Sequence, residues 1–377
     1  MENILITGGA GFIGSKLALS LINKGHRVTV LDNLSKQIHG QNNLDSSLYL
    51  SIRDKVKFIK GDVRNELDWH KALEGQNMVV HLAAETGTGQ SMYEINKYVD
   101  VNISGTAHLL DYLANESHQI KKVVVASSRA IYGEGKYKCR DHGFVYPESR
   151  LEIDMLASQF EPTCPFCSEI VEMVPTDEGS KINPCSIYGI TKYNQEQMVL
   201  VACKSLKIDA VALRYQNVYG PGQSLSNPYT GILSIFSTRI LNNNSIQIFE
   251  DGMESRDFVY IDDVVNATTL ALFESKAKDK SLNVGSGEST SVLKVAETLK
   301  ESYNSSIDIS ITSSFRIGDI RHNCADVSMA KQELDFVPTV TFDKGVRMFS
   351  EWVKTQKIQK DDYDESIKLL QQKGLIK

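Results

Sequence analysis

Short apolar segments alternate with amphipathic helical stretches up to about residue 217 of this 377-residue chain. The apolar segments, rich in Val, Ile and Leu, occupy residues 3–7, 27–32, 56–62, 77–84, 121–128 and 209–216. Helical stretches separate them, for example at 12–24, 92–116 and 186–206. Strands that are apolar along their whole length are buried on both faces, which is typical of parallel sheets. The alternation therefore predicts a doubly wound α/β fold.

The pattern changes after about residue 217. Helices are expected near 229–242, 289–303 and 344–355, and short strands at 245–250, 281–284 and 307–313. This arrangement predicts a smaller α/β lobe that packs beside the first and leaves a cleft between the two. The last segment, residues 356–377, is predicted to form a polar helix, which we interpret as a solvated appendage.

Composition limits the class of protein. The chain is 41% hydrophobic and 23% charged, with a net charge of −6 and no basic block. These values are ordinary for a soluble globular protein and give no indication of a nucleic-acid partner. No apolar run approaches the ~20 residues of a membrane helix, and the first residues lack the basic segment of a signal peptide. We therefore expect a cytoplasmic protein with no nucleic-acid or membrane partner.

A glycine-rich turn lies between the first predicted strand and the first helix. The segment ITGGAGFIGSKLA contains Gly8-x-x-Gly11-x-x-Gly14. Such a turn lets the backbone approach a pyrophosphate, which the N–H groups of the following helix then face. The next strand ends in Asp32, a carboxylate that can bind both ribose hydroxyls of NAD and would repel the 2′-phosphate of NADP. The sequence thus predicts NAD binding; the alternative is a tight turn without a ligand.

Two further strand ends fit the same cofactor pocket. Asp62 follows the third strand, where it either closes the adenine side or forms a turn; the sequence supports both roles equally. The fourth strand ends in HLAA (81–84), whose small side chains allow a flat cofactor to approach. His81 itself is interpreted as a packed core histidine.

Hydroxyl groups are predicted beside this pocket. Ser127 and Ser128 lie at the carboxyl end of the fifth strand, the edge where open α/β sheets bind ligands. Tyr188 and Lys192 are four residues apart on a predicted helix, so their side chains share one face. A lysine ammonium beside the phenol would lower the pKa of Tyr188 from its ordinary value of about 10. Tyr188 is therefore a candidate general base for a sugar or alcohol hydroxyl.

The order of these motifs resembles the extended short-chain dehydrogenase/reductase family, and within it the nucleotide-sugar epimerase and dehydratase branch. The resemblance covers roughly residues 3–350. It includes LRYQNVYGPGQ, ESRDFVYIDDVV, LNVGSGE and RIGDIRH, which begin at residues 213, 254, 282 and 316. It implies a Rossmann-type NAD-binding fold and a nucleoside-diphosphate-sugar substrate. It also implies a homodimer formed through the helices at 92–116 and 186–206.

The resemblance assigns roles to individual residues. Ser128, Tyr188 and Lys192 are implied to be catalytic. The implied cofactor-binding set is Gly8, Gly11, Phe12, Ile13, Gly14, Asp32, Asn33, Asp62, Val63, Leu82, Ala83, Ala84, Asn102, Tyr188 and Lys192. The implied substrate-binding set is Thr86, Ser128, Arg129, Tyr188, Asn217, Arg256 and Arg316. The arginine forks suit diphosphate oxygens, and a surface salt bridge is the alternative role for each of them.

The two residues after Ser128 help to distinguish which reaction of this branch, dehydration or epimerisation, the chain is expected to catalyse. The 4,6-dehydratases of this branch have a strand-end motif that looks like STDEVYG, whose Asp-Glu pair performs the acid/base steps that remove water. Arg129 and Ala130 stand there in this chain, which disfavours dehydration. Asp32 disfavours an NADP-dependent reductase. What remains is reversible oxidation at a sugar carbon with retained NAD, which is epimerase chemistry at C4.

Only the resemblance to known groups of this branch limits the choice of sugar substrate. SSRAIYGEG, the segments at 85–95 and 214–236, and a Cys/His insertion resemble the group that interconverts dTDP-L-rhamnose and dTDP-6-deoxy-L-talose. A UDP-hexose or UDP-N-acetylhexosamine 4-epimerase is the alternative. A dehydratase, a reductase and a non-catalytic NAD-binding scaffold agree less well with the motifs.

Two cysteine-containing pairs lie between the Ser128 and Tyr188 motifs. Cys139-x-x-His142 and Cys164-x-x-Cys167 are separated by 21 residues, a spacing typical of tetrahedral zinc. Four protein ligands would close the metal shell, so the zinc is expected to be structural. A disulfide between the last two cysteines and unpaired thiols are the alternatives. We expect a zinc-stapled flap that shapes or covers the sugar pocket.

These predictions give a domain plan. Residues 1–218 and about 243–284 are expected to form the NAD-binding domain, with 136–182 as an inserted zinc lobe. Residues 219–242 and 285–355 are expected to form the nucleotide-sugar lobe, followed by the polar helix at 356–377.

Overall fold

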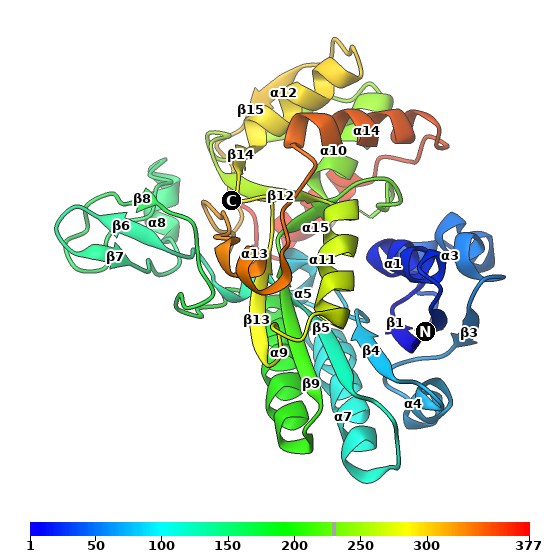
Figure 1. Ribbon diagram of the computed structural model, residues 1–377. Helices are drawn as coiled ribbons and strands as arrows, with labels where there is room; N and C mark the ends of the chain where they lie inside the picture. The colour runs from blue at the N-terminus through cyan, green and yellow to red at the C-terminus, as the bar shows by residue number, and fades with distance from the viewer. Residues whose placement is uncertain (228–230) are drawn as a thin grey trace.

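A parallel sheet forms the centre of the computed structural model, which describes residues 1–227 and 231–377 (Figure 1). The strand order is β13-β9-β5-β4-β1-β2-β3, and each neighbouring pair is parallel. The strands are β1 (Asn3–Thr7), β2 (Arg27–Asp32), β3 (Lys57–Lys60), β4 (Met78–His81), β5 (Lys122–Ser128), β9 (Asp209–Tyr215) and β13 (Lys280–Val284). The predicted doubly wound parallel sheet is confirmed.

The sheet is buried on both faces. Ile4 and Ile6 pack into one core and Leu5, between them, packs into the other, because successive side chains of a strand point to opposite faces. The helices of the first core include α1 (Phe12–Asn23) and α11 (Ile261–Phe273). Those of the second are α4 (Glu66–Leu73), α7 (Gly105–Asn115) and α9 (Ile187–Leu206). This burial explains why the strands are continuous apolar runs in the sequence.

The strand order reverses between β1 and β4, and this switch point fixes the place of the predicted motifs. Ligands of open α/β sheets bind outside the carboxyl ends of the strands at such a point. The glycine turn follows the carboxyl end of β1, and Ser128 is the last residue of β5. Topology therefore puts both motifs on one edge of the sheet.

A second lobe lies at the top of Figure 1. Its small sheets have the orders β10-β12-β14 and β11-β15. Their strands are β10 (Asn217–Tyr219), β11 (Ile246–Ile248), β12 (Ser255–Tyr260), β14 (Ser289–Ser291) and β15 (Ile309–Ile311). The helices are α10 (Ile232–Leu241), α12 (Val292–Ser302) and α14 (Phe342–Lys354). The helix expected at 229–242 overlaps residues 228–230, which lie outside the described residues.

Short helical elements connect these parts. They are α2 (Lys36–His39), η1 (Asn43–Asp45), α3 (Ser47–Ile52), α5 (Thr88–Ser91), η3 (Arg129–Ile131) and α13 (Ser328–Leu334). The single helix expected over 92–116 is divided into α6 (Ile95–Tyr98), a π-helical segment η2 (Val99–Ser104) and α7. π-Helical turns inside helices are frequent at functional sites.

The insertion forms a small lobe that projects from the body at the left of Figure 1. It contains β6 (Tyr137–Cys139), β7 (Gly143–Val145), α8 (Glu152–Leu156) and β8 (Glu172–Met173). The strands form an antiparallel sheet in the order β7-β6-β8. The buried core of this sheet consists of Tyr137, Cys139, Val145, Cys164 and Val171. So small a core gives little stability by itself, so the lobe needs a further constraint.

The C-terminal segment is docked on the body, and its interpretation as a solvated appendage is wrong. Helix α15 (Tyr363–Gln372) buries Tyr363 and Leu370. Arg239 contacts Asp364 at 2.8 Å, and Phe315 and Lys377 exchange two backbone hydrogen bonds. The buried positions share one face of a short helix whose remaining residues are polar, so the average composition conceals them.

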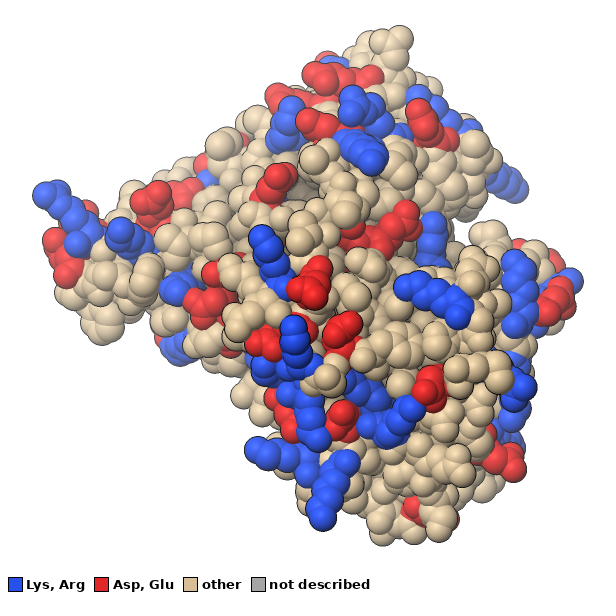
Figure 2. Space-filling model, in the orientation of Figure 1, with Lys and Arg blue, Asp and Glu red and all other residues tan. Residues whose placement is uncertain are grey.

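Charged side chains of both signs are intermixed over the face shown in Figure 2. The chain carries 41 Lys and Arg residues against 47 Asp and Glu residues, in agreement with this mixed surface. None of the described helices has both the length and the apolar character needed to cross a membrane.

Candidate functional site

A cavity of about 590 Å³ lies at the carboxyl edge of the sheet, against the second lobe. It brings together all the predicted cofactor- and substrate-binding residues except Asp62 and Asn102. Those that line it are Gly8, Gly11, Phe12, Ile13, Gly14, Asp32, Asn33, Val63, Leu82, Ala83, Ala84, Thr86, Ser128, Arg129, Tyr188, Lys192, Asn217, Arg256 and Arg316. One cavity therefore joins motifs that lie as far apart as residues 8 and 316 in the sequence.

The glycine turn is packed too closely to hold side chains. A Cβ on Gly14 would clash with the carbonyl oxygen of Gly8 and lie 2.6 Å from Cα of Gly9. Gly8 has a φ of +64°, a conformation that favours glycine. Helix α1 thus begins directly on the turn, and its N-terminal N–H groups are available to a phosphate in the cavity.

Asp32 is held in a fixed orientation at the cavity wall. Its Oδ2 accepts a hydrogen bond from the Ala10 N–H at 2.9 Å, and its Oδ1 accepts one from the Leu34 N–H at 2.8 Å. Burial raises the pKa of Asp32, while the Leu34 N–H, His39 and the Ala10 N–H act in the opposite direction. Such an oriented carboxyl group suits a pair of ribose hydroxyls.

His39 is a cavity residue that the sequence analysis missed. Its Nε2 lies 3.9 Å from Oδ1 of Asp32, and its Nδ1 shares a hydrogen bond with Ser46 Oγ. Histidine in a short connecting helix carries no sequence signal of this role, because the chain folds back to bring it against the end of β2.

Asp62 does not line the cavity, so the expected direct contact with the cofactor is not supported. Its Oδ1 and Oδ2 accept two hydrogen bonds from the Arg64 guanidinium, at 2.9 and 2.8 Å, and Oδ2 accepts another from Asn33 Nδ2. The Arg64 contact is the main reason why the pKa of Asp62 falls to about 2. Asp62 therefore stabilises the turn that carries Asn33.

Asn102 is also placed behind the cavity wall rather than on it. This buried side chain accepts a hydrogen bond from the Glu85 N–H at 2.8 Å and donates to the Glu85 carbonyl oxygen and Thr191 Oγ1. It thereby ties the loop after β4 to α9. These contacts give it a supporting role behind the cofactor side of the cavity.

Capping interactions bring Tyr188 to Ser128. Ser186 caps α9 through a hydrogen bond from the Gly189 N–H, and Ser128 caps η3 through one from the Ala130 N–H. A Cβ on Gly189 would clash with the Ala130 carbonyl oxygen, so the first turn of α9 packs directly on the end of β5. Tyr188 and Ser128 consequently share the cavity.

The expected lowering of the Tyr188 pKa by Lys192 is wrong for this structure. Burial raises the pKa of Tyr188, and a hydrogen bond with Ser128 and the charge of Arg129 oppose it. Lys192 Nζ instead donates a hydrogen bond to Gln195 Oε1 at 2.6 Å. Burial lowers the pKa of Lys192 to about 7, against the opposing effect of Glu196. A lysine with this pKa can hold or release a proton near neutral pH.

Three arginines give the substrate side of the cavity a positive character. Arg129 Nε donates to Asn217 Oδ1 at 2.7 Å, and Arg256 Nη2 donates to Asp319 Oδ1 at 3.0 Å. Arg316 Nη1 lies 3.8 Å from the other oxygen of Asp319. Although burial raises the pKa of Asp319, the charges of Arg256, Arg316 and Arg129 lower it to about 2. Asp319 does not neutralise three guanidinium groups, and burial raises the pKa of Glu254, another carboxyl group of the cavity, to about 7. The site therefore suits a diphosphate.

The C-terminal helix supplies another wall that was not predicted. Tyr363, Ser366, Ile367 and Leu370 of α15 all line the cavity. Their spacing of three, four and seven residues marks one face of a helix. This spacing is the sequence signal that could have identified them. The direction in which the face points depends on contacts with Arg239 and residues 315–317, distant in sequence from α15.

The four predicted metal ligands lie together in the inserted lobe. The ligand atoms of Cys139, His142, Cys164 and Cys167 are all within 4.8 Å of one another. Sγ of Cys139 is 3.5 Å from His142 Nδ1 and 3.7 Å from Cys167 Sγ. Zinc bonds of ~2.3 Å to sulfur and ~2.0 Å to nitrogen in a tetrahedron imply separations of about 3.5 and 3.8 Å. Cys164 and Cys167 form no disulfide in this structure.

The cavity and the inserted lobe are separate. Among the described residues of 136–182, none lines the cavity. The lobe therefore does not cover the sugar pocket; it packs instead on the second lobe, where Arg150 contacts Glu250 and Glu161 contacts Arg321.

Comparison with known proteins gives a family match over most of the chain. Residues 4–158 and 164–285 match the NAD dependent epimerase/dehydratase family. The chain is 34% identical over 355 residues to a dTDP-L-rhamnose 4-epimerase of Burkholderia thailandensis, covering 93% of this chain and 95% of the relative.

Solved structures agree with the fold. A UDP-N-acetylglucosamine 4-epimerase from Methanobrevibacter ruminantium, in complex with UDP-N-acetylmuramic acid, is 30% identical with a TM-score of 0.74 and covers 94% of this chain and 99% of its own. A UDP-glucuronic acid 4-epimerase from Bacillus cereus, in complex with UDP-glucuronic acid and NAD, is 28% identical with a TM-score of 0.75 and covers 93% and 99%.

Gly14→Ala tests the cofactor cradle. The added Cβ would meet backbone atoms of Gly8 and Gly9, so the turn must move and NAD affinity should fall by about tenfold or more. Calorimetric titration of NAD measures the change. Gly179→Ala is the control, because its Cβ would meet only the side chain of Asp177. Equal NAD affinity in Gly14→Ala and the wild type would contradict the assignment of this turn.

Ile367→Trp tests the wall formed by α15. The larger side chain would fill part of the cavity, and the affinity for UDP and dTDP should fall by about tenfold. Lys368→Trp is the matched control, because the next residue of the same helix is exposed. Isothermal titration calorimetry of both variants distinguishes the two positions, and unchanged binding by Ile367→Trp would show that α15 does not limit the ligand site.

Proposed function

The chain belongs to the NAD dependent epimerase/dehydratase family, and we propose that it is an NAD-dependent nucleotide-sugar 4-epimerase. The observation that carries this proposal is a single cavity that holds the glycine turn, the Ser128, Tyr188 and Lys192 side chains, and the arginine cluster. The 4-epimerase names of the relatives support it.

The cofactor side of the cavity fits NAD. The close packing of Gly14 leaves room for a pyrophosphate, and Asp32 is oriented for the adenosine ribose. Lys192 would hold the nicotinamide ribose. When bound, NAD supplies the acceptor and donor for the C4 hydride.

The residues of this chain provide proton transfer and orientation. Tyr188 would take the proton of the C4 hydroxyl as its phenolate, the form that burial disfavours and that Ser128 and Arg129 favour. Ser128 would hydrogen-bond the same oxygen as its charge changes. Arg256, Arg316 and Asn217 would hold the diphosphate while the oxidised sugar turns over. Tyr188 would return the proton after hydride addition to the opposite face, which inverts C4.

The residue after Ser128 favours epimerisation over dehydration. Arg129 occupies the position where the 4,6-dehydratase motif has an acidic residue. Burial together with the charge of Arg256 lowers the pKa of Arg129 only to about 10. It therefore remains a cation at neutral pH and cannot donate a proton for removal of water. Its bond to Asn217 places it among substrate-binding groups instead.

We propose dTDP-L-rhamnose as the substrate, converted to dTDP-6-deoxy-L-talose. The relative from Burkholderia thailandensis, 34% identical over nearly the full length of both chains, supports this choice. A UDP-hexose or UDP-N-acetylhexosamine is the second candidate, favoured by the likeness to the UDP-N-acetylglucosamine 4-epimerase structure.

We further propose that the inserted lobe holds one structural zinc ion. The clustering of its four ligand atoms within 4.8 Å and its small core support this assignment. Four protein ligands would leave no open position for catalysis.

A cytoplasmic homodimer remains part of the proposal. Exposed apolar side chains on α6, α9 and the π-helical segment, such as Ile95, Val99 and Val201, support an interface on these helices.

Tyr188→Phe tests the catalytic assignment. Loss of the phenol should reduce turnover by about 10²- to 10⁴-fold while NAD stays bound, because only the proton-transfer group is removed. Tyr193→Phe, on the same helix, is the control and should retain activity. NMR of products from dTDP-L-rhamnose, UDP-glucose and UDP-N-acetylglucosamine identifies the sugar. Normal turnover by Tyr188→Phe would rule out its role, and no conversion of any sugar by the wild type would favour a scaffold.

Metal analysis tests the zinc assignment. Purified wild-type protein and Cys185→Ser should each contain about one zinc ion per chain, because Cys185 lies outside the cluster. Cys164→Ser should lose most of it. Zinc far below one equivalent in the wild type would contradict the proposal.

A further inference from the structure

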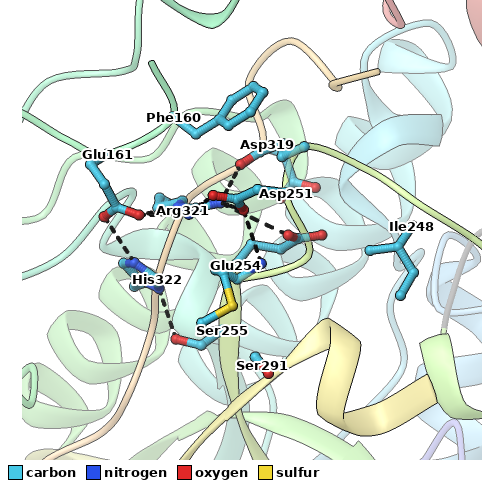
Figure 3. Close-up of polar contacts among 12 residues, drawn as sticks. Phe160, Glu161, Ile248, Asp251, Glu254, Ser255, Ser291, Asp319, Arg321 and His322 are labelled. Carbon is cyan, nitrogen blue, oxygen red and sulfur yellow. Dashed lines mark hydrogen bonds and ion pairs between the residues drawn. The ribbon is translucent and has the colours of Figure 1, made fainter. Parts of the chain in front are cut away.

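The inserted lobe contacts one short segment of the second lobe, residues 319–322, through the buried side chain of Arg150 and the partly exposed side chain of Glu161. Figure 3 shows Glu161 of the insertion pointing toward Arg321 and His322, with Ser255 beyond His322. This segment also carries Asp319, a cavity residue. The insertion is therefore connected to the substrate site indirectly, through residues 319–322.

Arg150 is the first contact. Its guanidinium, with the side chain only 4% exposed, donates to both oxygens of Glu250 at 2.8 and 2.9 Å. It also donates to the Asp319 carbonyl oxygen at 3.0 Å and to the Phe160 carbonyl oxygen at 3.1 Å. One side chain thus joins the insertion to the backbone beside the cavity.

Glu161 is the second contact. Its Oε1 accepts hydrogen bonds from Nε and Nη2 of Arg321 at 2.8 and 2.6 Å. Its Oε2 lies 3.1 Å from Nε2 of His322, whose Nδ1 is 2.9 Å from Ser255 Oγ. Glu161 therefore holds two consecutive residues, and through His322 it reaches the strand that carries Arg256.

Residues 319–322 orient the guanidinium of Arg256. Nη2 of Arg256 donates to Asp319 Oδ1 at 3.0 Å and to the Ile320 carbonyl oxygen at 2.8 Å. Its Nη1 donates to the Arg321 carbonyl oxygen at 2.9 Å. Three of its hydrogen-bond acceptors belong to residues 319–321, so the position of the guanidinium follows the position of that backbone.

We propose that the inserted lobe is a positioning element for the substrate diphosphate, in which Arg150 and Glu161 hold residues 319–322 and these residues orient Arg256. The inference rests on the proposed function, because it takes Arg256 as a diphosphate-binding group. Arg150 and Glu161 are positioning residues that act through Arg256 without touching the substrate.

A purely stabilising role explains these contacts less well. Burying ion pairs is a weak source of stability, because desolvation offsets much of the attraction. Here the contacts of Arg150 and Glu161 lead instead through residues 319–322 to Arg256, which lines the cavity. Small displacements of a binding group reduce affinity strongly, so a fixed Arg256 is the functional gain.

Titration of the NAD-loaded full-length protein with dTDP and with UDP tests the proposal. Glu161→Gln keeps the shape of the side chain and removes its charge; Arg150→Lys keeps the charge and removes the fork. Each variant should bind the preferred nucleotide about tenfold more weakly, with unchanged NAD content. In turnover, KM should rise by a similar factor while kcat changes less than about twofold.

The controls separate this proposal from the function itself. Glu148 lies in the same lobe and pairs with Lys181 and Asn183, away from residues 319–322, so Glu148→Gln should bind the nucleotide as the wild type does. Arg256→Lys should weaken binding, and adding Glu161→Gln to it should cause little further loss, because both act through one group. A merely structural role would instead give additive losses.

Two results would overturn the inference. Normal nucleotide binding by Glu161→Gln and Arg150→Lys, alongside weak binding by Arg256→Lys, would leave the epimerase proposal intact and remove the positioning role. Normal binding by Arg256→Lys would remove the diphosphate assignment of Arg256 and the positioning role with it. Should Arg150→Lys fail to fold, Glu161→Gln decides alone, because Arg321 retains Glu250 and Asp251 as partners.

Discussion

Because the central strands are all parallel, the connection between neighbouring strands must cross a face of the sheet, most often as a helix, and these helices bury both faces. All the carboxyl strand ends then lie on one edge. This constraint places the glycine turn after β1, Asp32 at the end of β2 and Ser128 at the end of β5 beside one another. The second lobe packs against the same edge, so the cavity forms where the fold already gathers its polar strand ends.

Buried charge holds the helix that carries Tyr188 and Lys192. Glu196, one turn beyond Lys192, is fully buried and accepts hydrogen bonds from Arg214, Ser127 and Ser281. These partners lie on β9, β5 and β13, so one carboxylate fastens α9 to three strands. Removing one partner of such a pair leaves an uncompensated charge, at a cost of about 3–5 kcal/mol. The network gives the catalytic helix a single position on the sheet.

Features with a local sequence signal were predictable, and features that depend on distant contacts were not. Apolar runs and the glycine spacing gave the sheet and the cofactor turn, because strand burial and close helix packing act within a few residues. The pKa of Tyr188 was predicted in the wrong direction, because helix spacing does not report burial or the bond of Lys192 to Gln195. The place of α15 on the cavity depends on Arg239 and residues 315–317, which no local pattern connects to residue 363.

The inserted lobe needs one constraint that fixes its internal structure and another that fixes it on the body, and different residues provide the two. Its neck is closed where Lys136 pairs with Asp177 and bonds to Val174 and Thr176, so extra residues between these points add little loop-closure entropy. The Cys/His cluster can fix the lobe internally, but a cluster confined to the lobe does nothing to fix it on the body. Contacts with the body prevent the lobe from turning about its neck; they include those of Arg150 and Glu161 and the packing of Met155 and Phe160 on Phe315. Because the Arg150 and Glu161 contacts meet the segment that orients Arg256, part of what holds the lobe on the body also bears on the position of Arg256.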